Sequence, residues 1–352
     1  MAGVKYKLFG AALEALYFSG AHVALRPLVG GVGAILMLHH VRPPRPDRFQ
    51  PNRLLEVTPS FFEDVIRGLR RSKVDVVSLD EMHRRMSTGD FSHRFVCVTF
   101  DDGYRDNFEY AYPILKAHDM PFAIYVAADF AERAGELWWL ALEAVIAQNA
   151  RVELRMGDVE RRFETQSVHG KREAFDQIYG WLRRLKTEDE LRAAMRDLAF
   201  RHSVDMARFC AELCMDWQEL SALAADPLVT IGAHTVSHPI LTKLDDASVR
   251  AELEGSCRAI EARMGGRPQH LAYPVGDRAS AGPREFAIAA ELGFKTAVTT
   301  RPGVLFRGHA AHLTALPRIS LNGNFQAPRY AKVLMSGAAT GLWNGFRPLD
   351  IT

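Results

Sequence analysis

The chain of 352 residues has few cysteines and almost no net charge. Its four cysteines lie within apolar patterns, so we expect free, reduced thiols that act as small core residues. Its 44 basic and 42 acidic residues give a formal net charge of +2 at pH 7, which supplies no overall attraction for nucleic acid or anionic lipid. We therefore expect no disulfide framework and no nucleic-acid partner. The cysteines are Cys97, Cys210, Cys214 and Cys257.

The amino-terminal segment, residues 1–33, lacks the features of a cleaved export signal or a membrane span. Glu14 interrupts its apolar run, no small-residue cleavage site precedes Pro27, and no uninterrupted stretch of about twenty apolar residues occurs. We expect instead an amphipathic helix over about Tyr6 to Leu25, which either packs on the rest of the domain or rests on a membrane surface. The expected location is the cytoplasm, with membrane association through this segment left open.

Strand and helix signals alternate along most of the chain. This alternation predicts parallel strands joined by crossover helices. From about Leu137 to Ala225 the pattern changes to a stretch rich in Arg, Glu, Leu and Ala, which we expect to be a helical insertion. The eight expected strands are centred on Ile35, Val76, Val98, Ile124, Val229, Leu271, Val298 and Ile319.

One buried strand ends in two adjacent carboxylates. The apolar run Val96–Phe100 leads directly into Asp101, Asp102 and Gly103. Neighbouring side chains on an extended segment point in opposite directions, so the two carboxylates can contact different partners. Taken alone, the pattern is more typical of a solvated Asp-Asp-Gly turn.

A second motif favours a functional role for these carboxylates. His234 and His238 are four residues apart, and neutral imidazole is a common nitrogen ligand for divalent metals. Together with a carboxylate at a strand end, they suggest a site of two histidines and one carboxylate. Such a site suits zinc, cobalt, nickel or ferrous iron.

These two motifs, Thr99–Gly103 with Asn107 and His234–Pro239, resemble the first two motifs of the polysaccharide deacetylases, also called NodB-homology domains or family 4 carbohydrate esterases. The resemblance runs from about Ile35 to Leu321, apart from the insertion. It implies a distorted (β/α) barrel over residues 34–324, followed by a helical tail at 325–352. It also implies a metal-dependent enzyme that hydrolyses the acetamide of N-acetylated sugars and releases acetate. Zn²⁺ is the expected metal, with Co²⁺, Ni²⁺ or Fe²⁺ as alternatives.

The resemblance also implies roles for individual residues. Asp101 corresponds to the general base, and the expected metal ligands are Asp102, His234 and His238. Tyr273 and Pro274 resemble the third motif of the family, so we expect them to contact the substrate, with a backbone N–H close to Tyr273 stabilising the oxyanion.

Aromatic residues at the start of the insertion leave two roles open. Trp138 and Trp139 either stack on sugar rings or anchor the insertion to the barrel.

The sequence departs from the family pattern at two points. The late motif that often supplies an acidic histidine has none here, but one branch of the family carries an early histidine instead, and His39 resembles it. We therefore expect His39 to be the general acid, with His40 in reserve. The third motif lacks its usual arginine. Arg318 is the candidate substitute, unless it is only an exposed arginine at a strand edge.

The glycan itself is left open by the sequence. A chitooligosaccharide, an exopolysaccharide and a cell-envelope or lipopolysaccharide precursor all fit, and the cytoplasmic location favours a lipid-linked precursor. Two alternatives to this enzyme class are a related metal-dependent amidase acting on a small cyclic amide and a non-catalytic descendant that binds carbohydrate.

Overall fold

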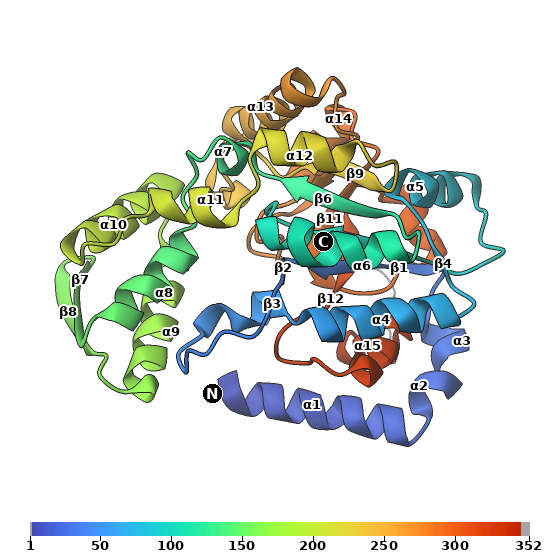
Figure 1. The fold of residues 1–352 in the computed structure, drawn as a ribbon, viewed down its shortest axis with the longest axis horizontal. Coiled ribbons are helices and arrows are strands. Elements are labelled where there is room, and N and C mark those ends of the chain that lie inside the picture. The colour runs from blue at the N-terminus through green and yellow to red at the C-terminus, as the bar shows by residue number, and fades with distance from the viewer. Residues whose placement is uncertain (1, 346–352) are drawn as a thin grey trace.

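A barrel of parallel strands surrounded by helices dominates the computed structural model, which describes residues 2–345 (Figure 1). Each of the eight expected strand centres falls within a strand of one sheet, so this prediction is confirmed. Strands β1 and β5 are buried at all six of their positions, which explains their continuous apolar runs. The strands are β1 (Gly33–Leu38), β4 (Asp75–Val76), β5 (Phe95–Phe100), β6 (Phe122–Val126), β9 (Val229–Ala233), β10 (His270–Ala272), β11 (Thr296–Pro302) and β12 (Leu316–Ser320).

Strand order closes the sheet on itself. The sequence of neighbours is β1-β12-β11-β10-β9-β6-β5-β4, and every pairing is parallel. Because β1 also pairs with β5 along its whole length, seven strands form a closed barrel and β4 lies outside it. The (β/α) barrel expected from the motifs is therefore confirmed.

Crossover helices pack around the barrel, and their ends follow local sequence signals. Thr58 caps the helix that follows it by accepting a bond from the Phe61 N–H, and Gly265 ends another with φ +78°. These helices are α4 (Pro59–Arg71), α5 (Leu79–Thr88), α6 (Tyr112–Ala117), α7 (Ala128–Ala131), α12 (Trp217–Ala224), α13 (Asp246–Met264) and α14 (Pro283–Glu291). Shorter elements include β2 (His40–Val41), which pairs with β3 (Glu56–Val57), and the helical turns Pro51–Leu55, Asn107–Ala111, Leu241–Lys243 and Arg307–Ala311.

The insertion forms a second core beside the barrel, at the left of Figure 1. It contains α8 (Trp138–Gln148), β7 (Arg151–Met156), β8 (Val159–Glu164), α9 (Val168–Arg184), α10 (Glu188–Arg201) and α11 (Ala207–Leu213). The expectation of an all-helical insertion is wrong for the hairpin β7–β8. Val152 and Leu154 are buried while their neighbours are exposed, a period of two, and Gly157 with φ +66° allows the two-residue turn.

Helix α12 belongs to the barrel rather than to the insertion. Its side chains Trp217, Leu220 and Leu223 are buried in the same core as the barrel helices. The insertion therefore ends before Trp217 and not at Ala225.

Helices from both ends of the chain pack together. The single helix expected over Tyr6–Leu25 is broken at Gly20, whose φ is +73°, into α1 (Ala2–Phe18) and α2 (Ala21–Ala24), and α3 (Arg26–Val29) follows. Leu13 on α1 is fully buried, and Glu14 pairs with Arg329 on α15 (Pro328–Met335). The segment therefore packs on the rest of the domain, and its contact with a membrane surface stays a prediction. A last helix, α16 (Ala338–Trp343), lies in the expected tail, whose residues 346–352 are outside the described part.

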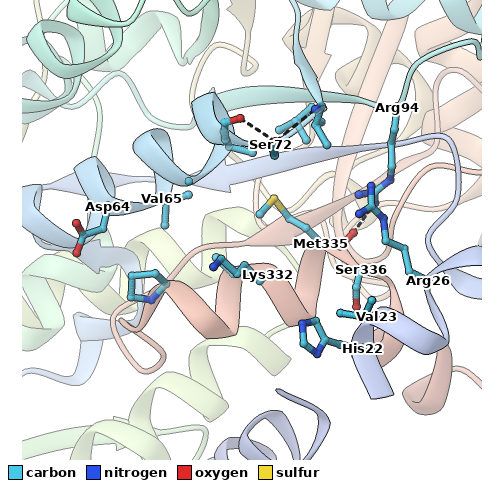
Figure 2. Close-up of a pocket in the computed structure, with 16 residues that line it drawn as sticks. His22, Val23, Arg26, Asp64, Val65, Ser72, Arg94, Lys332, Met335 and Ser336 are labelled. Carbon is cyan, nitrogen blue, oxygen red and sulfur yellow. Dashed lines mark hydrogen bonds between the residues drawn. The ribbon is translucent and has the colours of Figure 1, made fainter. Parts of the chain in front are cut away.

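Helices α2, α3, α4 and α15 contribute to a cavity of about 240 Å³ (Figure 2). Within residues 2–345, none of the helices has the length and apolar content that crossing a bilayer requires. The four cysteines are free and buried, as expected.

Gly232 shows how tightly the strands beside the metal-ligand motif are packed. A Cβ atom at this position in β9 would lie 2.5 Å from the buried ring of Tyr125 and 3.1 Å from the His270 carbonyl oxygen. We expect Gly232→Ala to lower the free energy of unfolding by about 1–3 kcal/mol through overpacking. Gly68→Ala is the control, because no atom lies within 4 Å of its added Cβ in α4. It should raise that free energy by about 0.5–1 kcal/mol. Urea unfolding of both variants checks this; equal stability would contradict it.

Candidate active site

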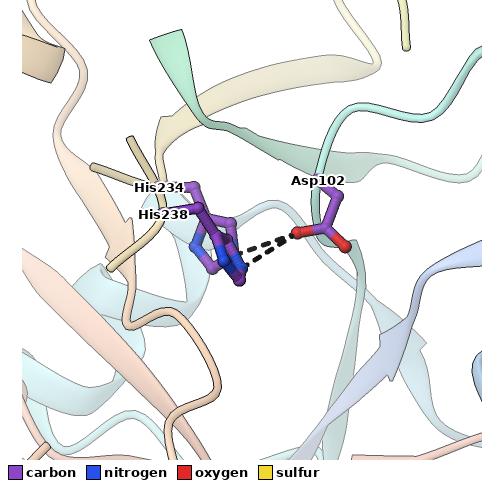
Figure 3. Close-up of side chains that lie close together, drawn as sticks. All are labelled: Asp102, His234 and His238. Atoms are coloured by element: carbon purple, nitrogen blue, oxygen red, sulfur yellow. Dashed lines mark ion pairs between the residues drawn. The ribbon is translucent and has the colours of Figure 1, made fainter. Parts of the chain in front are cut away.

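The two motifs meet at the carboxyl ends of neighbouring strands. Asp102 follows β5 and His234 follows β9, and only β6 separates these strands in the sheet. The Nε2 atoms of His234 and His238 each lie 3.3 Å from Oδ1 of Asp102, and all three side chains are buried (Figure 3). The structure therefore brings together the three residues expected to bind metal.

Hydrogen bonding around these side chains fits a cation. Nδ1 of His234 lies 2.7 Å from the Ala272 carbonyl oxygen, so this nitrogen carries the proton and Nε2 presents a lone pair to Asp102. The Oδ1 atom of Asp102 is buried and accepts no hydrogen bond. Two electron-pair donors thus face each other across 3.3 Å without a proton between them. A divalent cation between these atoms would satisfy both, and the donor set of two imidazoles and one carboxylate suits zinc and its neighbours.

Backbone conformation around the cluster is unusual. Asp102, Thr235 and His238 have positive φ values of 71°, 68° and 59°, a region that costs a non-glycine residue about 1–3 kcal/mol. Glu252 holds the histidine loop by accepting hydrogen bonds from the N–H groups of Val236 and Ser237 at 2.8 and 2.9 Å. The surrounding structure therefore maintains a strained loop, which is typical of functional sites.

Asp101 is not part of the metal cluster and instead forms an ion pair with Arg318. The guanidinium binds both carboxylate oxygens, at 2.7 and 2.6 Å, and its Nε donates to the Thr299 carbonyl at 2.8 Å. Burial would raise the pKa of Asp101, but the charge and hydrogen bonds of Arg318 outweigh burial and hold that pKa below its usual value. Arg318 is fully buried, so the alternative of an exposed arginine is wrong.

His39 and His40 point to different surroundings, as strand alternation predicts. Nε2 of His39 lies 3.9 Å from Oδ2 of Asp101, and its side chain is 17% exposed. Burial lowers the pKa of His39, and the nearby charge of Asp101 only partly opposes this. His40 is buried instead, with Nδ1 2.6 Å from Oδ2 of Asp106 and its ring stacked on Tyr104. Only His39 therefore lies beside the expected base.

The insertion contacts the metal-ligand loop directly. The Trp139 ring lies 5.0 Å from the ring of His238, and Glu188 accepts a 2.9 Å bond from the Ile240 N–H. Trp138 and Trp139 are only 4% and 7% exposed, so their ring faces are covered by protein. This corrects the sugar-stacking alternative for Trp138 and Trp139 and favours the anchoring one.

Tyr273 and Pro274, in the third motif, do not have the exposed positions that substrate contact requires. The Tyr273 N–H donates to the Val298 carbonyl at 3.1 Å, and its hydroxyl donates to the Thr314 carbonyl at 2.8 Å. Both groups are therefore engaged within the protein, and Pro274 is buried as well. The Tyr273 side chain is therefore not available for direct contact with the substrate. Since Pro274 has no N–H, the next amide along the loop is that of Val275, whose φ is +60°.

Sequence reasoning missed several supporting residues. Glu252 lies on α13 with the appearance of an ordinary helical surface glutamate, and nothing in its spacing links it to the histidine loop. Asp106 and Tyr104 lie within the first motif and could have been suspected from that position alone. Their contacts to His40 join that motif to the early histidine pair.

Comparisons with known proteins agree with this geometry. The polysaccharide deacetylase family model matches residues 88–297, which is more than half of the chain. The deacetylase PplD from Streptococcus pyogenes, solved with acetate, is 20% identical at a TM-score of 0.58, with 86% of this chain and 97% of that chain covered. IcaB from Ammonifex degensii is 16% identical at a TM-score of 0.52, over 86% and 97% of the two chains.

A polysaccharide deacetylase from Bacillus cereus is 15% identical at a TM-score of 0.54, over 86% of this chain and 68% of that one. At these identities the structural neighbours support the fold, while the family model supports membership. No curated protein matches the chain.

Metal analysis tests the buried cluster. We expect the purified protein to bind about one divalent ion per chain, and His234→Ala or His238→Ala to lose it, because each removes one of three protein ligands. His93→Ala is the control, since its side chain is 73% exposed. Elemental analysis after dialysis provides the measurement. Full occupancy in both ligand variants would refute the assignment.

Proposed function

Since the chain belongs to the polysaccharide deacetylase family, hydrolases that act on carbon–nitrogen bonds of acetylated glycans, we propose that it is a metal-dependent N-deacetylase that releases acetate from an N-acetylated sugar. The proposal rests on the buried cluster of Asp102, His234 and His238. The neighbouring residue Asp101 forms an ion pair with Arg318. The acetate in the PplD structure is the product that such a reaction forms.

Asp102, His234 and His238 are the residues that would hold the metal. A bound divalent ion supplies Lewis-acid polarisation of the acetamide carbonyl and lowers the pKa of water. The protein contributes the orientation of these ligands, through the bond from His234 Nδ1 to Ala272 and the bonds from the histidine loop to Glu252.

Asp101 is the proposed general base. Its lowered pKa keeps the carboxylate ionised through neutral pH, and the two bonds from Arg318 fix its orientation. It accepts the proton of the water that attacks the carbonyl carbon. Arg318 acts through Asp101 and is therefore a positioning residue.

His39 is the proposed general acid. As the bond between the carbonyl carbon and the sugar nitrogen breaks, that nitrogen must gain a proton before the amine leaves. His39 is the partly exposed imidazole beside the base, with its Nε2 3.9 Å from Oδ2 of Asp101, and its proton goes to the sugar nitrogen. Acetate and the free amino sugar are the products.

Membership of the family implies an acetylated glycan as substrate but does not identify which glycan. Chitooligosaccharides, exopolysaccharides and cell-envelope precursors remain candidates, and a small cyclic amide remains the alternative substrate. Comparing acetate release from N-acetylated oligosaccharides with ring opening of cyclic amides separates these possibilities.

Removing the base should separate chemistry from metal binding. We expect Asp101→Asn to lower kcat at least about 10²-fold with the metal retained, because Asp101 is not among the metal ligands. This variant leaves the Arg318 charge buried without an anion, which is destabilising. The double variant Asp101→Asn/Arg318→Met removes both charges and should be equally inactive. Acetate release and metal content are measured together; near-native turnover in either variant would mean that the base lies elsewhere.

The two early histidines should respond differently to substitution. We expect His39→Ala to lower kcat by about 10²-fold or more, with metal content and stability near those of the wild type. His40→Ala should keep kcat within about tenfold but lower the free energy of unfolding by about 1–3 kcal/mol, because it removes a buried imidazole that stacks on Tyr104 and pairs with Asp106. Kinetics and urea unfolding of both variants check this. A reversal of the kinetic effects would move the acid to His40.

A further inference from the structure

Helix α1 is apolar on both of its faces. Its inner face contributes Phe9, Leu13 and Leu16 to the barrel core. Its outer face, which is exposed, carries Leu8 and Phe18 at 67% and 76% exposure with only alanines at positions 11, 12 and 15 between them. Lys7 is exposed on this helix as well, but Leu8 and Phe18 are large apolar side chains that nothing covers in the described residues. The outer face of α1 therefore lacks a partner in the described residues.

More exposed apolar side chains follow the turn after α1. Val23 on α2 is 64% exposed and Leu28 on α3 is 79% exposed. Together with Phe18 they form what we call the amino-terminal corner, three large apolar side chains within eleven residues. Single exposed apolar residues are ordinary on protein surfaces, but a contiguous group marks an interaction site.

A cavity opens beside this corner. Val23 and Arg26 line it from α2 and α3, and Lys332 lines it from α15 (Figure 2). Its volume of about 240 Å³ lies just below the range of roughly 300–1,000 Å³ for small-molecule sites. It is therefore sized for part of a larger amphiphile. Apolar side chains make up most of its wall, among them Val65, Leu69, Val74, Val96, Ala331 and Met335.

Three cationic side chains line the cavity. Within residues 2–345, no carboxylate forms an ion pair with Arg26, Arg94 or Lys332. Arg94 instead donates to the carbonyls of Gly30 and Met335. Burial, together with repulsion from Arg26, lowers the pKa of Arg94 to about 10. The lining therefore combines an apolar wall with unbalanced positive charge, which is complementary to an anionic amphiphile.

The acidic residues of this region do not cancel that charge. Glu14 is the one acidic residue between positions 2 and 33, and Arg329 and Tyr330 already bind it. Asp64 is the one carboxylate in the cavity lining. Although the whole chain is nearly neutral, the corner is locally positive and apolar, the combination that binds anionic bilayers.

We infer that the amino-terminal corner and the adjacent cavity form a docking surface for an anionic phospholipid bilayer. Phe18, Val23 and Leu28 enter the acyl-chain boundary, while Arg26 and Lys332 bind phosphate groups at the mouth of the cavity. This inference is independent of the proposed catalytic residues, because Arg94 and Val96 lie at the start of β5, whereas Asp101 follows its end.

Vesicle sedimentation tests the docking surface with the full-length protein. Vesicles contain either phosphatidylcholine alone or equal parts of phosphatidylcholine and phosphatidylglycerol. We expect binding at least about tenfold tighter to the anionic vesicles, and weaker binding as salt is raised. Arg26→Ala and Lys332→Ala should each weaken binding about fivefold. Phe18→Ser/Leu28→Ser should weaken it at least about tenfold, because these side chains lose their apolar contact with the acyl region.

Matched controls lie on the insertion, away from the corner. Phe200 is 85% exposed on α10, and Arg172 is exposed on α9, so Phe200→Ser and Arg172→Ala remove the same chemical groups elsewhere. Both should bind vesicles like the wild type, and circular dichroism should show every variant folded. Equal binding to neutral and anionic vesicles, or equal loss in the control variants, would overturn the inference. So would a concentration-dependent dimer that Phe18→Ser/Leu28→Ser dissociates without any binding to vesicles, since a second copy would then cover the corner.

Discussion

The buried ion pair between Asp101 and Arg318 is the constraint on which the site depends. A carboxylate and a guanidinium taken out of water are tolerated only when they bind each other with good geometry, and here two short bonds join them. Arg318 lies on β12, the last strand in the described chain, and Asp101 follows β5; β1 lies between these two strands and pairs with both. Closure of the barrel therefore also places Arg318 where it orients the Asp101 carboxylate.

The insertion and the histidine loop form a second level of support. Trp139 packs near His238, Arg192 donates to the Ser237 carbonyl at 2.7 Å, and Glu252 binds the loop from the other side. Positive φ values at Thr235 and His238 show that the loop would not hold this conformation on its own. The insertion thus supports the loop that carries His234 and His238, although it shares no strand with the barrel.

Sequence patterns predicted the strands and the grouping of Asp102 with His234 and His238 better than the contacts around them. The apolar strand runs and the Asp-Asp and His-x-x-x-His motifs depend on local chemistry, so they could be recognised without a structure. The hairpin β7–β8 escaped notice because arginines and glutamates fill its exposed positions and hide the period of two. Whether Trp138 and Trp139 are exposed, and whether the Tyr273 amide is free, depends on partners distant in sequence such as Tyr179 and Val298. No local sequence pattern predicts those contacts.

The length of β5 acts as a spacer between the two ends of the barrel. Its six residues separate the cavity lining at Arg94 from the carboxylate of Asp101, the proposed base, by ~20 Å at 3.3 Å per residue. A protein resting on a bilayer through its amino-terminal corner would hold its catalytic mouth at about that height, facing the water. Sugars a few bonds from a lipid anchor in the same bilayer would lie below its reach. Together, the proposed docking surface and the proposed active site thus favour an extended glycan chain that can bend up to the rim as the substrate.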